Sequence, residues 1–203
     1  MADPENPPRR VLADELAALH HPVRRRILEV LQVQGPATVG SMAATLGQQV
    51  GSISHHLKTL ERTGFVTPAP ELAKDKRESW WRGVSREVTW SITDFADSPT
   101  DTLLATAAER ANLQHHNDKV LSWFSDREEY DDAWLDAAFA TEQWATANPA
   151  ELGDLGRRVY ALFVQWTDEC RAAAEREQSD GDEDAAARRT PVFLFAHGNP
   201  SRP

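Results

Sequence analysis

The sequence predicts a mainly α-helical (α+β) fold, in which a helix-turn-helix domain with a β-hairpin wing precedes a helical C-terminal region and a short C-terminal strand. Three observations predict it: two short amphipathic segments meet at Gly47, a hairpin pattern follows them, and helical periodicity dominates the second half. The expected divisions are a disordered segment 1–9, the helix-turn-helix domain 10–92, a helical region 93–178, an acidic linker 179–189, and a strand and tail 190–203.

Two helices are predicted in ELAALHHPVRRRILEVLQVQG, residues 15–35. Pro22 suits a first-turn position, where its missing N–H removes no hydrogen bond. Gly35 and Pro36 are expected to end the second helix. The core candidates are Leu16, Leu19, Ile27, Leu28 and Leu31.

The helix-turn-helix is predicted in residues 38–64, where Thr38 suits an N-cap and Gly47 the turn. The residues expected to face inward are Val39, Met42, Ala43 and Leu46 of the first helix, and Val50, Ile53, Leu57 and Leu60 of the second. The opposite face of the second helix carries small, hydrogen-bonding or cationic residues, namely Gly51, Ser52, His55, Lys58, Thr59 and Arg62. Because this face has no bulky hydrophobe, it suits the major groove of DNA.

A β-hairpin wing is predicted after Gly64. Phe65 and Val66 begin a strand, residues 71–76 form a charged tip, and residues 79–83 return through two tryptophans.

The order of these segments carries a family resemblance. ALHHPVRRRILEVL is followed by TVGSMAATLG, then by SISHHLKTLERTGFV and KRESWWR. Over roughly residues 10 to 90 this combination resembles the winged helix-turn-helix of the arsenic-repressor-type (ArsR) transcriptional regulators. The resemblance implies a homodimeric regulator of transcription, usually a repressor, whose affinity for double-stranded DNA responds to a signal.

The resemblance also implies which residues meet DNA, with residues 49–58 in the major groove and residues 74–77 on the flanking backbone or minor groove. The expected DNA-binding residues are Thr38, Gln48, Gln49, Gly51, Ser52, Ser54, His55, Lys58, Thr59, Arg62, Lys74, Lys76 and Arg77. Dimerisation is expected through the helices of the second half together with Leu12, Leu16 and Leu19, which would place two recognition helices about one DNA turn apart on a near-palindromic site.

Charge is divided unevenly along the chain. The net charge is −10, yet residues 1–90 hold 12 basic and 10 acidic side chains, whereas residues 91–203 hold 10 basic and 22 acidic ones. The arginines at residues 24–26, with Arg82 and Arg86, are therefore expected to join the phosphate contacts. The acidic half is expected to stay away from DNA and to limit indiscriminate binding.

Three pairs of adjacent histidines, at residues 20–21, 55–56 and 115–116, have the look of metal ligands. Adjacent residues on a helix point about 100° apart, so they rarely bind one ion together. The stretches SMAATLG and ERANLQHHNDKV also lack the cysteines, or the spaced carboxylates and histidines, of metal-sensing ArsR members. We therefore expect no metal and no cofactor. His55 should face outward, and His56 should be packed.

The second half is predicted to contain a helix over residues 101–124 and another that begins at Pro149 and ends near Glu177. In the first helix the alanines at residues 107, 108 and 111 form a seam of small side chains, and in the second Asn148 and Glu151 suit the N-cap and the capping glutamate. Between the two helices, residues 130–146 are ambiguous: their first part favours a helix, whereas the alternation near Trp144 allows a strand. We expect a helix in the first part only.

Aromatic residues are dense in this half, and two interpretations stay open. They can form ordinary core, or they can line an apolar pocket at a helical dimer interface that binds a small organic effector. The candidate ligand-binding residues are Trp123, Trp134, Phe139, Trp144, Phe163 and Trp166.

Two segments have β character, residues 87–92 (EVTWSI) and residues 190–197 (TPVFLFAH). We expect them to pair with each other. The alternative is an edge strand that pairs with a dimer mate or only packs.

Composition sets the remaining expectations. One cysteine, Cys170, excludes internal disulfides, and its neighbouring carboxylates favour a structural rather than a redox-sensing role. The start of the chain lacks a signal-peptide pattern and no apolar run could span a bilayer, so we expect a cytoplasmic protein with no membrane partner. No catalytic motif is present, so no enzyme is expected. The alternative function is a winged-helix protein-interaction module without DNA binding.

Overall fold

The computed structural model describes residues 12–75, 78–84, 90–179 and 189–202. The chain divides into two compact units, Met1–Asp118 and Lys119–Pro203. The N-terminal segment expected to be disordered and most of the acidic linker lie outside the described residues. None of the helices in the described part combines the length and the apolar character needed to cross a lipid bilayer.

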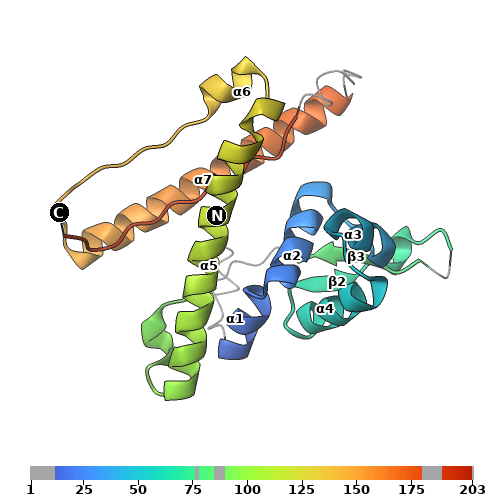
Figure 1. Cartoon of the computed structure of the whole chain (residues 1–203), viewed down its shortest axis with the longest axis horizontal. Coiled ribbons are helices and arrows are strands. Elements are labelled where there is room, and N and C mark those ends of the chain that lie inside the picture. Colours follow the sequence, from blue (N-terminus) through green and yellow to red (C-terminus); the bar gives the residue numbers. More distant parts are fainter. Residues whose placement is uncertain (1–11, 76–77, 85–89, 180–188, 203) are drawn as a thin grey trace. The chain divides into compact units, whose positions relative to one another are not determined.

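The first unit contains a winged helix-turn-helix, as the sequence predicts, followed by the beginning of a long helix (Figure 1). Its elements are α1 (Ala13–Leu19), α2 (Pro22–Gln34), β1 (Ala37–Thr38), α3 (Val39–Leu46), α4 (Val50–Arg62), β2 (Val66–Pro68), the 3-10 helix η1 (Pro70–Leu72), β3 (Trp80–Gly83), the 3-10 helix η2 (Ile92–Phe95) and the first part of α5 (Pro99–Asp126).

Local sequence signals set the helix ends as predicted. Pro22 occupies the first turn of α2, and Gly35 ends that helix with a φ of 78°. Thr38 caps α3, because its Oγ1 accepts a hydrogen bond of 3.1 Å from the backbone N–H of Ser41. Gly47 then turns the chain in the left-handed region, with a φ of 62°, which glycine adopts at the lowest cost.

One core holds the helix-turn-helix together. Its fully buried side chains are Ile27 of α2, Met42 of α3, and Ile53, Leu57 and Leu60 of α4. The predicted inward position of Val50 is wrong, since its side chain is 56% exposed. Val50 is the first residue of α4, and helix side chains lean toward the N-terminus, so it projects beyond the contact with α3.

A three-stranded antiparallel sheet in the order β1-β3-β2 forms the wing and ties it to the helices. The hairpin of β2 and β3 confirms the predicted wing. Strand β1 was not predicted; it pairs Ala37 with Trp81 and Thr38 with Trp80. Trp81 packs against the core of the helix-turn-helix, so the base of the wing is part of that core.

A second core joins α1 to the start of α5. Ala13 and Leu16 pack there with Phe95, Ala105 and Ala108. The expected contribution of Leu16 to a dimer contact is therefore wrong, because this side chain is fully buried within its own chain. Leu12, in contrast, is 60% exposed and Leu19 is partly buried.

The second unit holds the rest of α5, the 3-10 helix η3 (Arg127–Glu129), α6 (Asp132–Ala137) and α7 (Pro149–Ser179). The predicted start of α7 is confirmed: Asn148 Oδ1 accepts from the N–H of Ala150 at 2.9 Å and of Glu151 at 3.0 Å, and Glu151 Oε2 accepts from the N–H of Asn148. Helix α6 also confirms that only the first part of residues 130–146 is helical.

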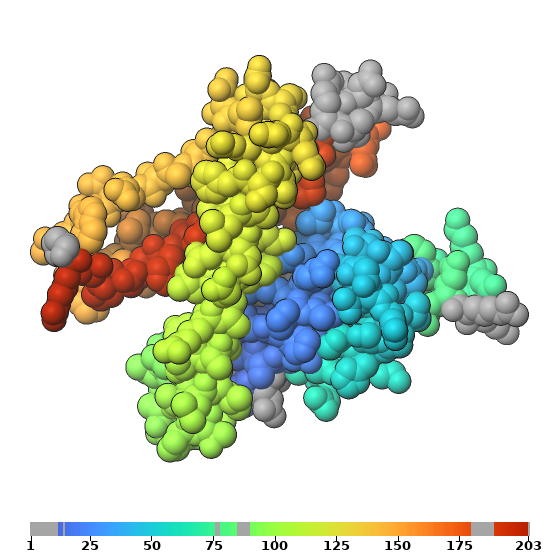
Figure 2. Space-filling view, viewed as in Figure 1, coloured from blue at the N-terminus to red at the C-terminus, as the bar shows by residue number. Residues whose placement is uncertain are grey.

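The expected strand over residues 190–197 is wrong. In the described part of this segment no strand forms, and its expected partner is outside the described residues at 87–89. The segment instead runs back beside α7 (Figures 1 and 2, red beside orange). Arg189 pairs with Glu177 at 2.7 Å, and Gly198 lies against Leu152. The apolar side chains of residues 192–195 have the face of a helix beside them, which provides no backbone groups for a β-ladder.

Candidate nucleic-acid interface

The face of α4 that points away from the core is open to solvent. Its exposed residues, with the two that precede the helix, are Gln48, Gln49, Gly51, His55, Lys58 and Arg62. Its half-buried residues are Ser52, Ser54 and Thr59. The only large hydrophobic side chain on α4 that is exposed is Val50, at the start of the helix. The structure thus brings the predicted set of α4 together on one side.

Two hydroxyl groups of the predicted set already have partners inside the protein. Thr38 Oγ1 caps α3, and it also contacts Ser41 Oγ at 3.1 Å. Thr59 Oγ1 donates to the carbonyl of His55 at 3.3 Å, within α4. These hydroxyls therefore help to shape the surface before any ligand arrives.

At the wing tip, one carboxylate orders the turn. Glu78 Oε2 accepts from the backbone N–H of Lys74 and from Trp80 Nε1, both at 3.0 Å. The hydrogen bond from Trp80, then that from Lys74, lowers the pKa of Glu78. The Lys74 side chain is exposed beside it, and Lys76 and Arg77 lie outside the described residues. The role of Glu78 was not predicted, because nothing in the sequence distinguishes it from the other charged residues near the tip.

The expectation that residues 24–26 all meet phosphate is wrong for two of the three arginines. Arg24 donates to the carbonyls of Ala17 and Ala18 at 2.9 and 2.6 Å, so it caps the end of α1. Arg25 turns toward α5. Arg26 alone among them is exposed. Consecutive residues on a helix point about 100° apart, so the three arginines point to α1, to α5 and to solvent. Arg82 likewise forms an ion pair with Glu71.

Three histidines lie close together beside the exposed face of α4. The ring centroid of His56 lies 4.8 Å from that of His21 and 5.5 Å from that of His55. His56 is half-buried, as predicted. The Nδ1 atoms of His21 and His56 are buried without a hydrogen-bond partner among the described residues. Burial lowers the pKa of both rings, and the nearby Arg24 lowers it further. The sequence gives no sign of this contact, because residues 21 and 56 are far apart along the chain.

The aromatic residues proposed to bind an effector are exposed or half-buried, and none of the six is fully buried. Trp123 packs on Tyr130 with ring centroids 5.3 Å apart. Phe139 and Trp144 are 77% and 60% exposed. Trp134 and Phe163 are half-buried, and Trp166 is exposed. An effector pocket lined by these residues stays a prediction.

Comparison with known proteins supports the helix-turn-helix assignment. Residues 19–69 match the family model described as a helix-turn-helix domain. None of the curated protein sequences matches the chain. Among solved structures, the chain is similar to Mycobacterium tuberculosis Rv0081, with 24% identity over 53% of this chain and 91% of that chain and a TM-score of 0.32.

Two further solved structures are similar over part of the chain. One is a possible transcriptional regulator for arsenical resistance, with 27% identity over 64% of this chain and 98% of that chain and a TM-score of 0.31. The other is a MarR family transcription regulator, with 19% identity over 77% of this chain and 82% of that chain and a TM-score of 0.32. The helix-turn-helix is therefore defined by the family match and by the geometry of residues 38–83.

Proposed function

We propose that this chain is a sequence-specific, homodimeric DNA-binding transcriptional regulator that acts in the cytoplasm as a repressor. One observation carries the proposal. Helix α4, with the two exposed glutamines that precede it, presents an open face of exposed glycine, histidine, lysine and arginine and half-buried serine, whereas its opposite face is fixed in the core by Ile53, Leu57 and Leu60. A rigid helix with such a face fits the major groove of B-DNA.

The side chains of α4, with Gln48 and Gln49 before it and Lys74 of the wing, divide into two proposed sets. Gln48, Gln49, Ser52 and His55 would offer donors and acceptors to base edges. A second set, made of Ser54, Lys58, Thr59, Arg62 and Lys74, would fix the position of the helix on phosphates. Val50 adds an apolar group at the entrance of α4, and its exposed methyl groups suit contact with the methyl group of thymine.

The operator follows from the symmetry of a dimer. Two copies related by a twofold axis place two α4 helices on a near-palindromic site, with half-sites about 10 base pairs apart. We propose that the exposed apolar residues of α5 and α7 form the dimer contact, and that a signal other than a metal ion releases the DNA. The six candidate aromatic residues are the proposed site of a small organic effector.

A binding-site selection from random duplexes, followed by titration of the selected operator and of a scrambled duplex, tests the proposal. His55→Ala and Ser52→Ala should weaken operator binding by about 1 to 3 kcal/mol and leave scrambled DNA nearly unaffected, because a base contact is lost. The matched control is Gln32→Ala, which removes an exposed polar side chain of α2. Equal losses on both duplexes would move His55 and Ser52 from the base contacts to the backbone contacts.

Lys58→Ala separates phosphate binding from base reading. It should weaken binding to every duplex and reduce the slope of log K against log salt by about 0.9, the value for one phosphate contact. An unchanged slope would remove Lys58 from the interface. A selection that enriches no sequence, with no binding to any duplex, would instead favour the alternative of a winged-helix protein-interaction module.

A further inference from the structure

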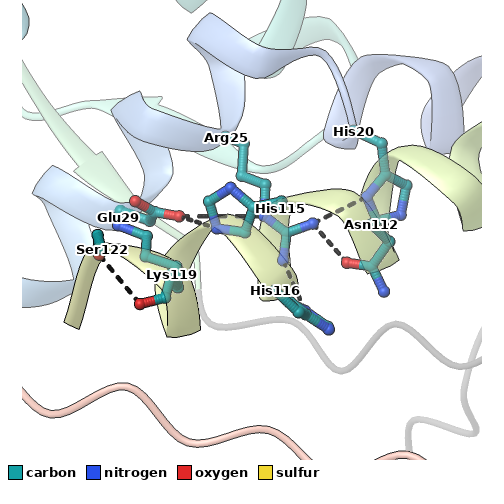
Figure 3. A network of polar contacts seen from close by, with 8 residues as sticks. All are labelled: His20, Arg25, Glu29, Asn112, His115, His116, Lys119 and Ser122. Carbon is teal, nitrogen blue, oxygen red and sulfur yellow. Dashed lines mark hydrogen bonds and ion pairs between the residues drawn. The ribbon is translucent and has the colours of Figure 1, made fainter. Parts of the chain in front are cut away.

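A polar network joins α2 to α5 inside the first unit (Figure 3). Its centre is Arg25 of α2. The Nη1 atom of Arg25 donates to Asn112 Oδ1 and lies 3.2 Å from Nδ1 of His20, which follows α1. Its Nη2 atom lies 3.1 Å from Nε2 of His116 on α5. One guanidinium group thus contacts three side chains that come from two other parts of the unit.

Hydrogen-bond accounting fixes the protonation state of the two histidines. A guanidinium group has donors and no acceptor, and it stays charged at every physiological pH. His20 Nδ1 and His116 Nε2 can therefore accept from Arg25 only when these nitrogen atoms carry no proton. A proton on either ring would place two N–H donors and two positive charges about 3 Å apart. The network as built requires both rings to be neutral.

One further contact beside the network, between His115 and Glu29, responds to a proton in the opposite direction. His115 Nε2 lies 2.6 Å from Glu29 Oε1, a contact that a proton would strengthen. Glu29 also faces Arg25, at 4.0 Å, and its side chain is 29% exposed, so water screens the gain. Protonation would therefore break the two contacts of Arg25 with His20 and His116 and strengthen the partly exposed contact of His115 with Glu29.

His20 is the most strongly affected of these groups. Its ring lies beside Trp90, with centroids 6.4 Å apart, and its Nε2 atom is buried with no hydrogen-bond partner among the described residues. Burial, and then the charge of Arg25, lowers the pKa of His20 from 6.5 to about 4. If opening of the network restores a pKa of 6.5, the opening equilibrium shifts about 30-fold between pH 7.5 and pH 5.0 from His20 alone.

The position of the network on α5 determines which part of the helix the opening equilibrium would affect. The second core holds α5 through Ala105 and Ala108, near the start of the helix. The network acts one to two turns later, from Asn112 to His116, just before the first unit ends at Asp118. Opening of the network would free this later stretch of α5 from α2, whereas the apolar contact with α1 would remain.

We propose that Arg25, His20, Asn112 and His116 form a proton-operated latch, in which mild acid opens the α2–α5 contact beyond Ala108 and thereby weakens operator binding. The opening itself is independent of the function proposed above; only the effect on the operator rests on that function. Protonation would thus change how the stretch of α5 after Ala108 packs on α2.

The test compares the wild type with a double variant that cannot be protonated, His20→Asn with His116→Gln. The amide oxygen of asparagine replaces Nδ1 as an acceptor, and that of glutamine replaces Nε2, so both can accept from Arg25 at every pH. His197→Gln is the matched control, because it removes an exposed histidine of the second unit. All three full-length proteins are studied by hydrogen–deuterium exchange, expressed as protection factors, at pH 7.5 and 5.0.

We expect residues 109–118 of the wild type and of His197→Gln to lose at least tenfold in protection at pH 5.0, while residues 102–108 keep theirs. The double variant should lose less than threefold. Equal losses in the double variant and the wild type, or no loss in either, would overturn the latch. If the double variant does not fold, the ring C–H NMR signals of wild-type His20 decide: its pKa must lie below the ordinary value of 6.5, and a His20 ring that titrates at 6.5 would also overturn the latch.

Operator affinity at the two pH values completes the test. The ratio of the affinity at pH 7.5 to that at pH 5.0 should be about tenfold larger for the wild type than for the double variant, and His55, present in both, cancels in this comparison. Equal ratios would refute the effect on DNA. Loss of protection without DNA binding at either pH would support the latch and refute the proposed function, so the two failures are distinguishable.

Discussion

Thr38 connects two parts of the fold through one residue. Its backbone pairs with Trp80 in the ladder of β1 and β3, and its hydroxyl oxygen accepts from the N–H of Ser41 to cap α3. The N–H of Val39, the first residue of α3, also donates to the carbonyl of Ser79 at 3.2 Å. The start of α3 and the end of the wing are therefore held by adjacent hydrogen bonds.

Thr38→Ala should lower the free energy of unfolding by about 1 kcal/mol, because one N–H at the start of α3 loses its cap. Urea denaturation followed by circular dichroism measures the change. Thr45→Ala is the control, since Thr45 is an exposed residue near the other end of the same helix. A Thr38→Ala protein as stable as Thr45→Ala would show that the cap contributes little.

His20 should make the stability of the chain depend on pH. Its pKa in the folded state, about 4, lies below the unfolded value of 6.5, so between these pH values the unfolded state binds a proton and the folded state does not. Stability should therefore be complete above pH 6.5 and fall as the pH drops toward 4. The loss of unfolding free energy between pH 7.5 and 5.0 is at most about 2 kcal/mol, because water that reaches the ring reduces the effect. Urea denaturation at both values measures it, and His20→Asn should remove most of it.

At the scale of elements, two glycines have different roles: Gly47 forms the turn between α3 and α4, and Gly51 lies on the exposed face of α4. Gly47 has a φ of 62°, where a side chain is strained. Gly51 is the second residue of α4, and a Cβ added there would meet nothing within 4 Å. Gly47 is therefore required by the backbone of the turn, whereas Gly51 leaves the exposed face of α4 without a side chain at that position.

Gly47→Ala should lower the free energy of unfolding by about 1 kcal/mol, through the left-handed backbone. Gly51→Ala should raise it by up to about 1 kcal/mol, because alanine is the better helix former. If the α4 face enters the major groove, Gly51→Ala should nevertheless bind the operator more weakly. Thermal unfolding and operator titration of both variants give the comparison; tighter operator binding by Gly51→Ala would contradict close approach of this face to DNA.

Elements with strong local signals were predictable from the sequence. Helices α2, α3 and α7 begin where Pro22, Thr38 and Asn148 place them. Helix α4 was predicted over residues 48–62 from its apolar periodicity and the turn at Gly47, and it begins two residues later, at Val50. Strand β1 has two residues, too few for any periodicity, and it exists because Trp80 and Trp81 pair with it. Residues 190–197 have β-forming side chains, but the partner they find is a helix.

The recognition face was also predictable, because it follows from the period of one helix. The roles of Arg24 and Arg25 were not. They depend on where the end of α1 and the side of α5 lie, and α5 is more than 70 residues away in sequence. Val50 shows a further limit: a period places it on the apolar face, but only the position of α3 determines whether anything covers it.

At the scale of the whole molecule, large apolar side chains remain exposed on α5 and α7. Leu121 and Phe124 of α5 are 61% and 59% exposed, and Leu155 and Leu162 of α7 are 51% and 61% exposed. Exposed apolar residues in such numbers are typical of surfaces that associate. This observation supports the proposed homodimer.

If the chain is the proposed homodimer, Leu121→Asp combined with Phe124→Asp should convert it to a monomer and weaken operator binding at least tenfold, because each chain alone would contribute one α4 helix to the DNA. Sedimentation equilibrium gives the mass, and the same samples are titrated with operator. Asn117→Asp adds a charge to an exposed position of the same helix and serves as the control. A wild type that sediments as a monomer of 22.7 kDa would contradict this arrangement.

The return of the C-terminal segment beside α7 turns this helix into a molecular ruler. Gly198 lies against Leu152, near one end of α7, whereas Ser179 is its last residue. At 1.5 Å per residue, a fluorescent donor at Ser179 and an acceptor at Asn199 are about 40 Å apart, within the working range of energy transfer. Detachment of the segment would change that distance, so the transfer efficiency would report in real time whether the segment stays in place.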